Sequence, residues 1–334
     1  MHSVQRSLFA LSLVAPLVLW APPAPAQAQP QASPPMPQQG WPQRTVRFIV
    51  SLGPGAGVDI GTRLLADRLS PRWGVPVVVE NRPGGDAIVA INAVVSARDD
   101  HVLLATPTSS FTAHPYIHDN LPYKPADILP IVRVSNTLIA LSVPSSLNVG
   151  SVKELAALAK AQPGKLNWAG VTGALDFLFA GFLKNSGLDM TKVPYRNPVE
   201  AANDLGEGRV QAYISALTIV RPQLQAGKVK LLAMTNTVRA PNAPDVPTVK
   251  EAGYPELTLD GLVGFFGPPG MPLALRERIA EDVRAVADPS IGARLADTGQ
   301  VMNIGGPADF GAATDEQRAK IAAIAKELGI KPTQ

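Results

Sequence analysis

The sequence predicts an α/β protein made of two doubly wound domains joined by a hinge. Strand-like apolar runs alternate with segments of helical spacing, and glycine-rich turns follow several of these runs. About 290 residues follow a proline-rich N-terminal part, too many for one compact core and suited to two domains. We expect domain 1 to comprise residues 44–140 and 263–334, and domain 2 residues 141–262.

The first series of elements has a βαβαβ order. Strands are expected at 44–50, 75–79 and 102–106, and helices at 59–69 and 86–97. The second strand is almost entirely valine, which is typical of a strand buried on both faces. A βαβαβ order predicts a parallel sheet with helices on both faces.

A proline-rich section then separates the two series. Ser151, with Glu154 completing a capping box, is expected to begin the second. Its expected strands are 165–169, 210–214, 229–234 and 262–267, and its expected helices are 175–185, 199–205, 220–225, 272–287 and 310–328. Apolar runs at 138–143 and 261–267 would carry the chain between the domains as a hinge. A cleft between hinged domains commonly holds a small ligand.

The N-terminus is typical of a secretory signal. Arg6 precedes an apolar run at 8–20, and two Ala-x-Ala sites follow within residues 24–28. We therefore expect residues 1–28 to be a signal peptide for the periplasm and 29–43 a Pro/Gln-rich leader; the alternative is a disordered tail. The chain has no cysteine, which excludes disulfides and a cysteine-linked lipid anchor.

The mature chain is expected to begin at Gln27 or Gln29, directly after one of the two Ala-x-Ala sites. N-terminal mass analysis of a periplasmic extract checks this expectation. An intact Met1 on cytoplasmic protein would contradict it.

The charge balance argues against a nucleic-acid partner. The formal net charge is +3, basic residues are scattered, and aromatic residues make up 5% of the chain. A nucleic-acid reader would show a basic patch or a row of stacking aromatics.

The first glycine-rich loop predicts an anion site. It lies between an apolar strand and a helix, where unpaired N–H groups meet the positive end of the helix dipole. Gly55, Ala56, Gly57 and Asp59 are its candidate ligand-binding residues. The dinucleotide fingerprint would need glycine where Ile60 stands, and no Gly-Lys-Ser/Thr triplet occurs. A strand-to-helix turn without a ligand is the alternative.

Two further loops follow the second and third strands. The second holds Gly84, Gly85 and Asp86, and the third holds the hydroxyls of Thr108 and Ser109. In a doubly wound sheet such loops gather at one edge, so a shared site is expected; ordinary turns are the alternative. Valine at Gly55 or Gly84 should block the ligand, unless these glycines need positive φ, in which case the fold would suffer.

A family resemblance follows from these loops. The chain is similar to the Bordetella-uptake-gene (Bug) family, the periplasmic solute-binding proteins of tripartite tricarboxylate transporters. The similar segments are 53–59 with Arg63, 78–84, 121–123, 151–155, 162–167, 193–196, 226–228, 243–249 and 251–253. The resemblance implies a monomeric Venus-flytrap protein that holds a small carboxylate in its interdomain cleft. The first two loops would grip one carboxylate through backbone groups and bridging waters. The partners would be membrane permease subunits or a sensor.

The sequence departs from the family pattern in both halves of the implied site. Asp86 follows Gly85 in the second loop, where it either caps the helix or rejects a second acid. In domain 2 the implied contacts are Thr172, Gly173 and Asp176, with Ser215 where the family commonly has aspartate. Asp176 is either a helix cap or a polar contact, and a contact would favour monocarboxylates or amino-bearing acids.

Catalysis is the competing class of function, as an exported hydrolase using the same cleft. No G-x-S-x-G nucleophile motif occurs. His114 and His118 have the spacing of a zinc-binding pair, but Pro115 argues against a helix between them. We expect no enzyme activity, cofactor or metal. A carboxylate pair of Asp59 and Glu80 stays open.

Overall fold

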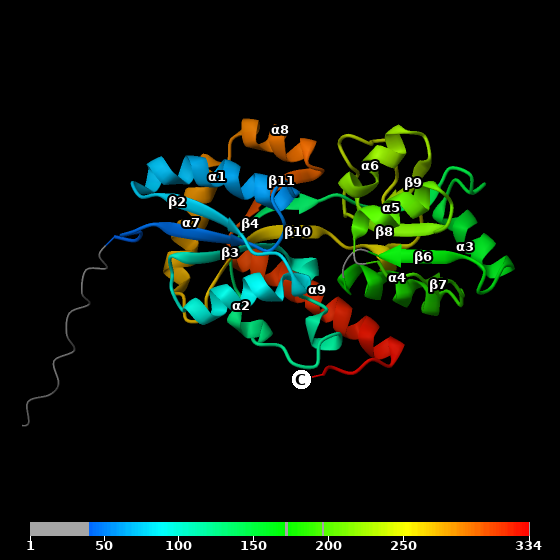
Figure 1. Cartoon of the computed structure of the whole chain (residues 1–334), viewed down its shortest axis with the longest axis horizontal. Helices are drawn as coiled ribbons and strands as arrows, with labels where there is room; N and C mark the ends of the chain where they lie inside the picture. The colour runs from blue at the N-terminus through cyan, green and yellow to red at the C-terminus, as the bar shows by residue number, and fades with distance from the viewer. Residues whose placement is uncertain (1–39, 171–172, 196, 334) are drawn as a thin grey trace, which may run out of the picture. The chain divides into compact units, whose positions relative to one another are not determined.

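The computed structural model describes residues 40–170, 173–195 and 197–333. The expected signal peptide and most of the leader therefore lie outside the described residues. Two sheets are present in the described part (Figure 1). One has the strand order β11-β4-β10-β3-β1-β2 and the other β7-β6-β8-β5-β9. Together with their helices they confirm the α/β class.

The first sheet is mixed rather than wholly parallel. Its strands are β1 Val46–Val50, β2 Val77–Asn81, β3 Val102–Pro107, β4 Leu129–Thr137, β10 Gly261–Gly267 and β11 Gln300–Gly305. Strand β1 pairs in parallel with β2 and β3, as the βαβαβ order predicts. Strands β10 and β11 pair antiparallel with β4, and β10 also with β3.

Alternation along β1 shows that helices cover both faces of this sheet. Phe48 and Val50 pack in a cluster with residues of α1 (Gly57–Trp73), α7 (Leu273–Val286) and α8 (Pro289–Asp297). Ile49 points the other way, into a cluster with α2 (Ile88–Ala97) and the start of α9 (Pro307–Leu328). The sheet is therefore doubly wound.

The valine-rich strand was wrongly expected to be buried on both faces. Strand β2 lies at the edge of the sheet, beside β1 only. Val78 is consequently 46% exposed. An apolar run does not reveal whether its strand has one neighbour or two.

The second sheet repeats the layered arrangement. Its strands are β5 Ile139–Pro144, β6 Asn167–Gly170, β7 Thr191–Lys192, β8 Ala212–Ala216 and β9 Val229–Met234. Helices α3 (Val152–Ala161) and α4 (Gly173–Asn185) pack on one face, and α5 (Pro198–Gly206) and α6 (Leu217–Gln225) on the other. The Ser151 cap of α3 is confirmed, since its side chain accepts from the Glu154 N–H; Glu154 itself accepts from Gly150.

Two crossings connect the sheets, as expected. The chain passes from β4 through Leu138 into β5, and it returns after β9 to enter β10. Asn236 ties the first crossing, accepting from the Ile139 N–H at 2.8 Å and donating to the Thr137 carbonyl at 2.9 Å. The domain boundaries assigned from the sequence stay a prediction.

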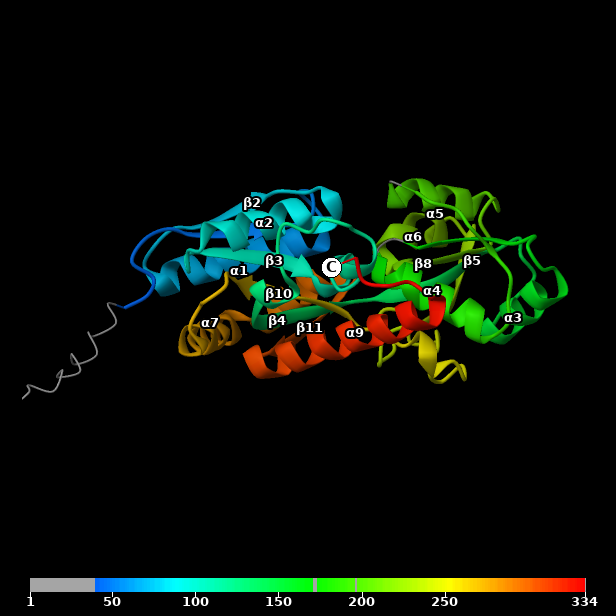
Figure 2. The same cartoon turned by 90° about the horizontal axis from the view of Figure 1, so that it is seen from below.

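Helix α9 is shared by the two layered assemblies. Phe310 near its start packs under the first sheet, and Ile321 and Ile324 pack with α4 and the second (Figure 2). In the described part of the chain no helix is both long and apolar enough to cross a membrane.

Candidate functional site

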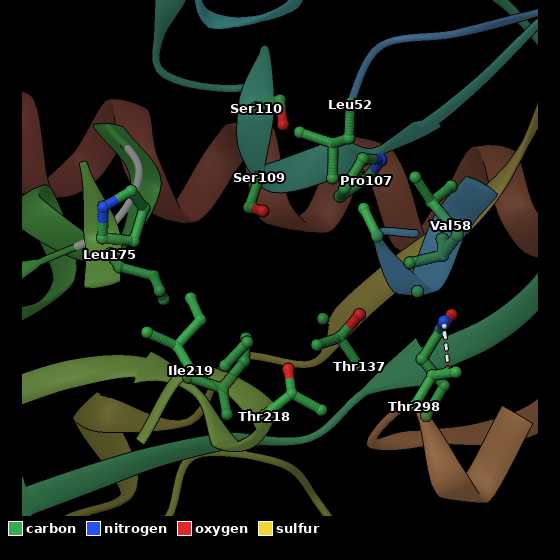
Figure 3. Close-up of a pocket in the computed structure, with 18 residues that line it drawn as sticks. Leu52, Val58, Pro107, Ser109, Ser110, Thr137, Leu175, Thr218, Ile219 and Thr298 are labelled. Atoms are coloured by element: carbon green, nitrogen blue, oxygen red, sulfur yellow. Dashed lines mark hydrogen bonds between the residues drawn. The ribbon is translucent and has the colours of Figure 1, made fainter. Parts of the chain in front are cut away.

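A cavity of ≈ 300 Å³ lies between the two sheets (Figure 3). From the first half, the loops after β1 and β3, strand β10 and the turn between α8 and β11 line it. From the second half, β5 and the first turns of α4, α5 and α6 line it. A cavity that lies between two sheets and is lined by helix N-termini is suited to a small ligand.

Helix α1 brings unpaired N–H groups to this cavity. Gly57 and Val58 begin the helix and line the cavity, and their N–H groups have no partner among the described residues. The preceding cap residue, Ala56, offers no side-chain acceptor. The N–H groups therefore stand free at the positive end of a 17-residue helix, where an anion is stabilised.

The glycines before the helix serve the loop itself. The Gly55 N–H donates to the Asp59 carboxylate at 2.9 Å, and the Ala56 N–H donates to the Gly53 carbonyl at 3.2 Å. Gly55 has φ +83°, which favours glycine. The N–H groups of Gly55 and Ala56 are therefore already paired, and those of Gly57, also predicted, and Val58 are without a partner among the described residues.

Asp59 braces the loop from behind. Its side chain is nearly buried and accepts from three donors: Gly55, Arg63 at 3.0 Å and Asn81 at 2.8 Å. Asn81 also donates to the Leu52 carbonyl, so the end of β2 holds the first loop in place. Glu80 pairs instead with Arg82, and its carboxylate has no contact with Asp59 among the described interactions.

Asp59→Ala should destabilise the protein by about 2–3 kcal/mol, because it removes a buried acceptor and leaves three donors unpaired. Arg63 is half exposed, which keeps the loss below that of a fully buried pair. Urea unfolding checks this. The matched control is Asp67→Ala, an exposed residue of the same helix, and an equal loss in both variants would contradict the brace.

Gln300 forms the floor next to Gly57. The side chain is 2% exposed; its Oε1 accepts from Ser135 at 2.5 Å and its Nε2 donates to Thr298 at 3.1 Å (dashed in Figure 3). These bonds fix the amide and leave its second N–H without a partner among the described residues. Ser109 and Ser110 line the cavity between Leu175 and Val58 (Figure 3), and neither hydroxyl has a hydrogen bond to a described residue.

The opposite wall is mainly apolar. Leu175 and Ile219 lie together, on the side of the cavity away from Val58, and Ile139, Pro198 and Ala216 extend this wall (Figure 3). Thr218 adds one hydroxyl. The first turn of α6 adds N–H groups without a described partner, at Thr218 and Ile219.

The structure brings part of the predicted site together. Ala56, Gly57 and Ser109 line the cavity. Gly55 and Asp59 lie directly behind its wall. Thr108 is buried and donates to Gln317 at 2.5 Å, and Ser215 is buried in β8; neither lines the cavity.

The second loop lies outside this cavity. Gly84, Gly85 and Asp86 are not among its lining residues. Gly84 and Gly85 both have positive φ, as Gly55 does, so a valine at Gly55 or Gly84 would strain the backbone and could not test ligand contact alone. The Asp86 carboxylate lies 3.7 Å from His118 Nε2.

His114 and His118 do not form a metal pair. The ring of His114 is buried, its Nδ1 is hydrogen-bonded to the Tyr123 hydroxyl, and the two imidazoles pack edge to face. Among the described residues no group of three or more His, Cys, Asp or Glu side chains could hold a metal ion.

The described domain 2 residues of the predicted site do not line the cavity either. Thr172 is outside the described residues, and Gly173 packs closely under Ile117 and Ala113. Asp176 lies in the first turn of α4, and its carboxylate pairs with Lys192 at 2.6 Å and packs over Gly170. Burial raises the pKa of Asp176, with Lys192 opposing the shift.

Asp176→Asn should leave the ranking of ligands unchanged, because the side chain is paired and does not line the cavity. Because its pKa is raised in the folded state, Asp176 binds more protons there than in the unfolded chain. The free energy of unfolding therefore falls as the pH rises from about 4 through the folded pKa. The stability of the asparagine variant relative to wild type should therefore increase from pH 4 to pH 7. Urea unfolding at both values measures this, and an opposite trend would contradict it.

The residues that sequence reasoning missed come mostly from the opposite wall and the floor. These are Thr137, Ile139, Leu175, Pro198, Ala216, Thr218, Ile219, Gly261, Val263, Thr298 and Gln300; Leu52, Val58, Pro107 and Ser110 of the first half were missed as well. The start of α6 at Leu217 could have indicated the opposite wall. It was not recognised, because Ala216 has no capping side chain and the helix was expected to begin at residue 220.

Known proteins resemble the chain over most of its length. Residues 62–330 match the model of the tripartite tricarboxylate transporter family receptor. A UPF0065 protein of Bordetella bronchiseptica is 28% identical over 99% of this chain and 96% of the relative. Protein BugT of Bordetella pertussis is 30% identical, over 69% of this chain and 72% of the BugT sequence.

Solved structures agree with the family match. An R. palustris protein solved with adipate is 29% identical, with a TM-score of 0.75 over 88% of this chain and all of that one. The periplasmic binding protein BugD is 27% identical, with a TM-score of 0.71 over 87% of this chain and 99% of that one. With a family match over residues 62–330, the chain belongs to the tripartite tricarboxylate transporter receptor family.

Proposed function

We propose that the protein is a periplasmic solute-binding protein that captures a small carboxylate in the cavity between its sheets. The free N–H groups of Gly57 and Val58 carry this proposal, because both residues line the cavity at the positive end of α1. Two N–H groups in a row suit the two oxygens of a carboxylate, as charge-assisted hydrogen bonds. A related R. palustris protein, solved with adipate, supports the ligand class.

The cavity serves binding rather than hydrolysis in this proposal. A serine nucleophile needs a base within hydrogen-bond reach. Ser109 and Ser110 line the cavity, but no histidine or carboxylate of the described residues is hydrogen-bonded to either hydroxyl. The protein would act as a monomer that delivers its ligand to membrane permease subunits, or reports the liganded state to a sensor. Its two halves would close over the ligand as a Venus flytrap.

Calorimetric titration of the mature protein tests the proposal. The panel is small mono- and dicarboxylic acids, each paired with its uncharged amide. At about 100 times its dissociation constant a true ligand stabilises the fold by about 2.7 kcal/mol, which thermal unfolding also detects. Acids should bind and their amides should not. Equal binding of acid and amide, or release of product from the matching esters, would contradict the proposed function.

A further inference from the structure

The two ends of the cavity differ in chemistry. Next to Val58 lie the N–H groups of Gly57 and Val58 and the Gln300 amide, whereas Ser109 and Ser110 lie between this end and Leu175 (Figure 3). The far end is walled by Leu175 and Ile219 (Figure 3). A ligand that fills the cavity therefore has its hydrogen-bonding group at one end and an apolar body at the other.

The absence of charge from the described lining favours a ligand with a single carboxylate. None of the described lining residues carries a charge. A carboxylate on α1 already places one negative charge in this space. A second would be repelled by the first, and no cationic side chain of the described lining offsets that repulsion. An uncharged far end of the ligand avoids this cost.

We propose, resting on the proposed function, that the ligand is a monocarboxylate of about six carbons in all, with an apolar body. Its carboxylate lies on the N-terminus of α1 and its body lies against Leu175, Ile219 and Pro198. The selectivity comes from the uncharged apolar wall and not from Asp176, whose carboxylate is paired with Lys192.

Three acids of equal length test this inference: hexanoate, 6-hydroxyhexanoate and adipate, titrated by calorimetry into the mature protein. Hexanoate and 6-hydroxyhexanoate should each bind at least about tenfold more tightly than adipate, a difference of about 1.4 kcal/mol. Tighter binding of adipate overturns the inference and leaves the proposed function intact. If no acid of the wider panel binds, both fail.

A charge placed in the apolar wall provides the second test. Ile219→Lys puts a cation at the far end, and it should shift the hexanoate-to-adipate affinity ratio toward adipate by at least about tenfold. Val238→Lys is the matched control, because Val238 is 58% exposed and does not line the cavity. An unchanged ratio in a folded Ile219→Lys protein, or an equal shift in both variants, would overturn the inference.

Discussion

Gly57→Val should lower the affinity for carboxylates by at least about 100-fold, or about 2.7 kcal/mol. A Cβ at Gly57 would overlap the Gln300 amide and would lie 3.3 Å from the Thr298 hydroxyl. Gln300 cannot move aside freely, because Ser135 and Thr298 hold it in a buried position. The valine would therefore displace either the floor of the site or the first turn of α1, and the free N–H groups would lose their alignment.

Gly53→Ala is the matched control for this experiment. Gly53 lies in the same loop, its φ is not positive, and the space where a Cβ would stand is empty. Calorimetry measures the affinity of both variants, and circular dichroism confirms that they fold. If Gly57→Val binds carboxylates with wild-type affinity, the start of α1 does not contact the ligand and the prediction is wrong.

Acid should destabilise the protein through His114. This side chain is 1% exposed. Burial, with a smaller contribution from the neighbouring His118, lowers its pKa to about 4, although Asp86 opposes the shift. In the unfolded chain the imidazole titrates near 6.5. The unfolded state therefore binds more protons, and stability falls as the pH drops from about 6.5 to about 4, by up to about 3 kcal/mol.

Two variants separate titration of His114 from loss of its hydrogen bond. His114→Gln removes the ionisable group, so the unfolding free energy should change less between pH 7 and pH 4. Tyr123→Phe removes the partner of Nδ1 but keeps the buried imidazole, so it should lose stability at both pH values and keep the steep acid loss. Urea unfolding across this range decides the point; a wild-type slope in His114→Gln would contradict the assignment.

The fold was predictable where local pattern and burial agree. Strand β9 has the predicted bounds, and α1, α4 and α9 extend beyond their predicted apolar segments by a few residues. Local pattern predicts none of β4, α8 and β11. Pro130 stands within β4, and β11 is half buried, so neither strand shows a clear alternation. Strand β4 pairs with β10 and β11, and β11 pairs with β4 alone; these partners lie far apart in the chain, so local pattern does not reveal them.

The site was predictable on one side only. The glycine-rich loop marks the start of α1. The sequence does not reveal that the Gly55 and Ala56 N–H groups already donate hydrogen bonds to Asp59 and Gly53. The opposite wall has no motif, because Leu175 and Ile219 look like ordinary core residues of their helices. Their role follows from the meeting of the two sheets, and that is a tertiary property.

A crystal structure with bound 6-bromohexanoate tests the central claim most directly, since anomalous scattering from bromine locates the tail of the ligand independently of its carboxylate. The account predicts carboxylate oxygens within hydrogen-bond distance of the Gly57 and Val58 nitrogens, with bromine against Leu175 and Ile219. A carboxylate bound at the start of α6, or a ligand bound outside the cavity between the sheets, would contradict it.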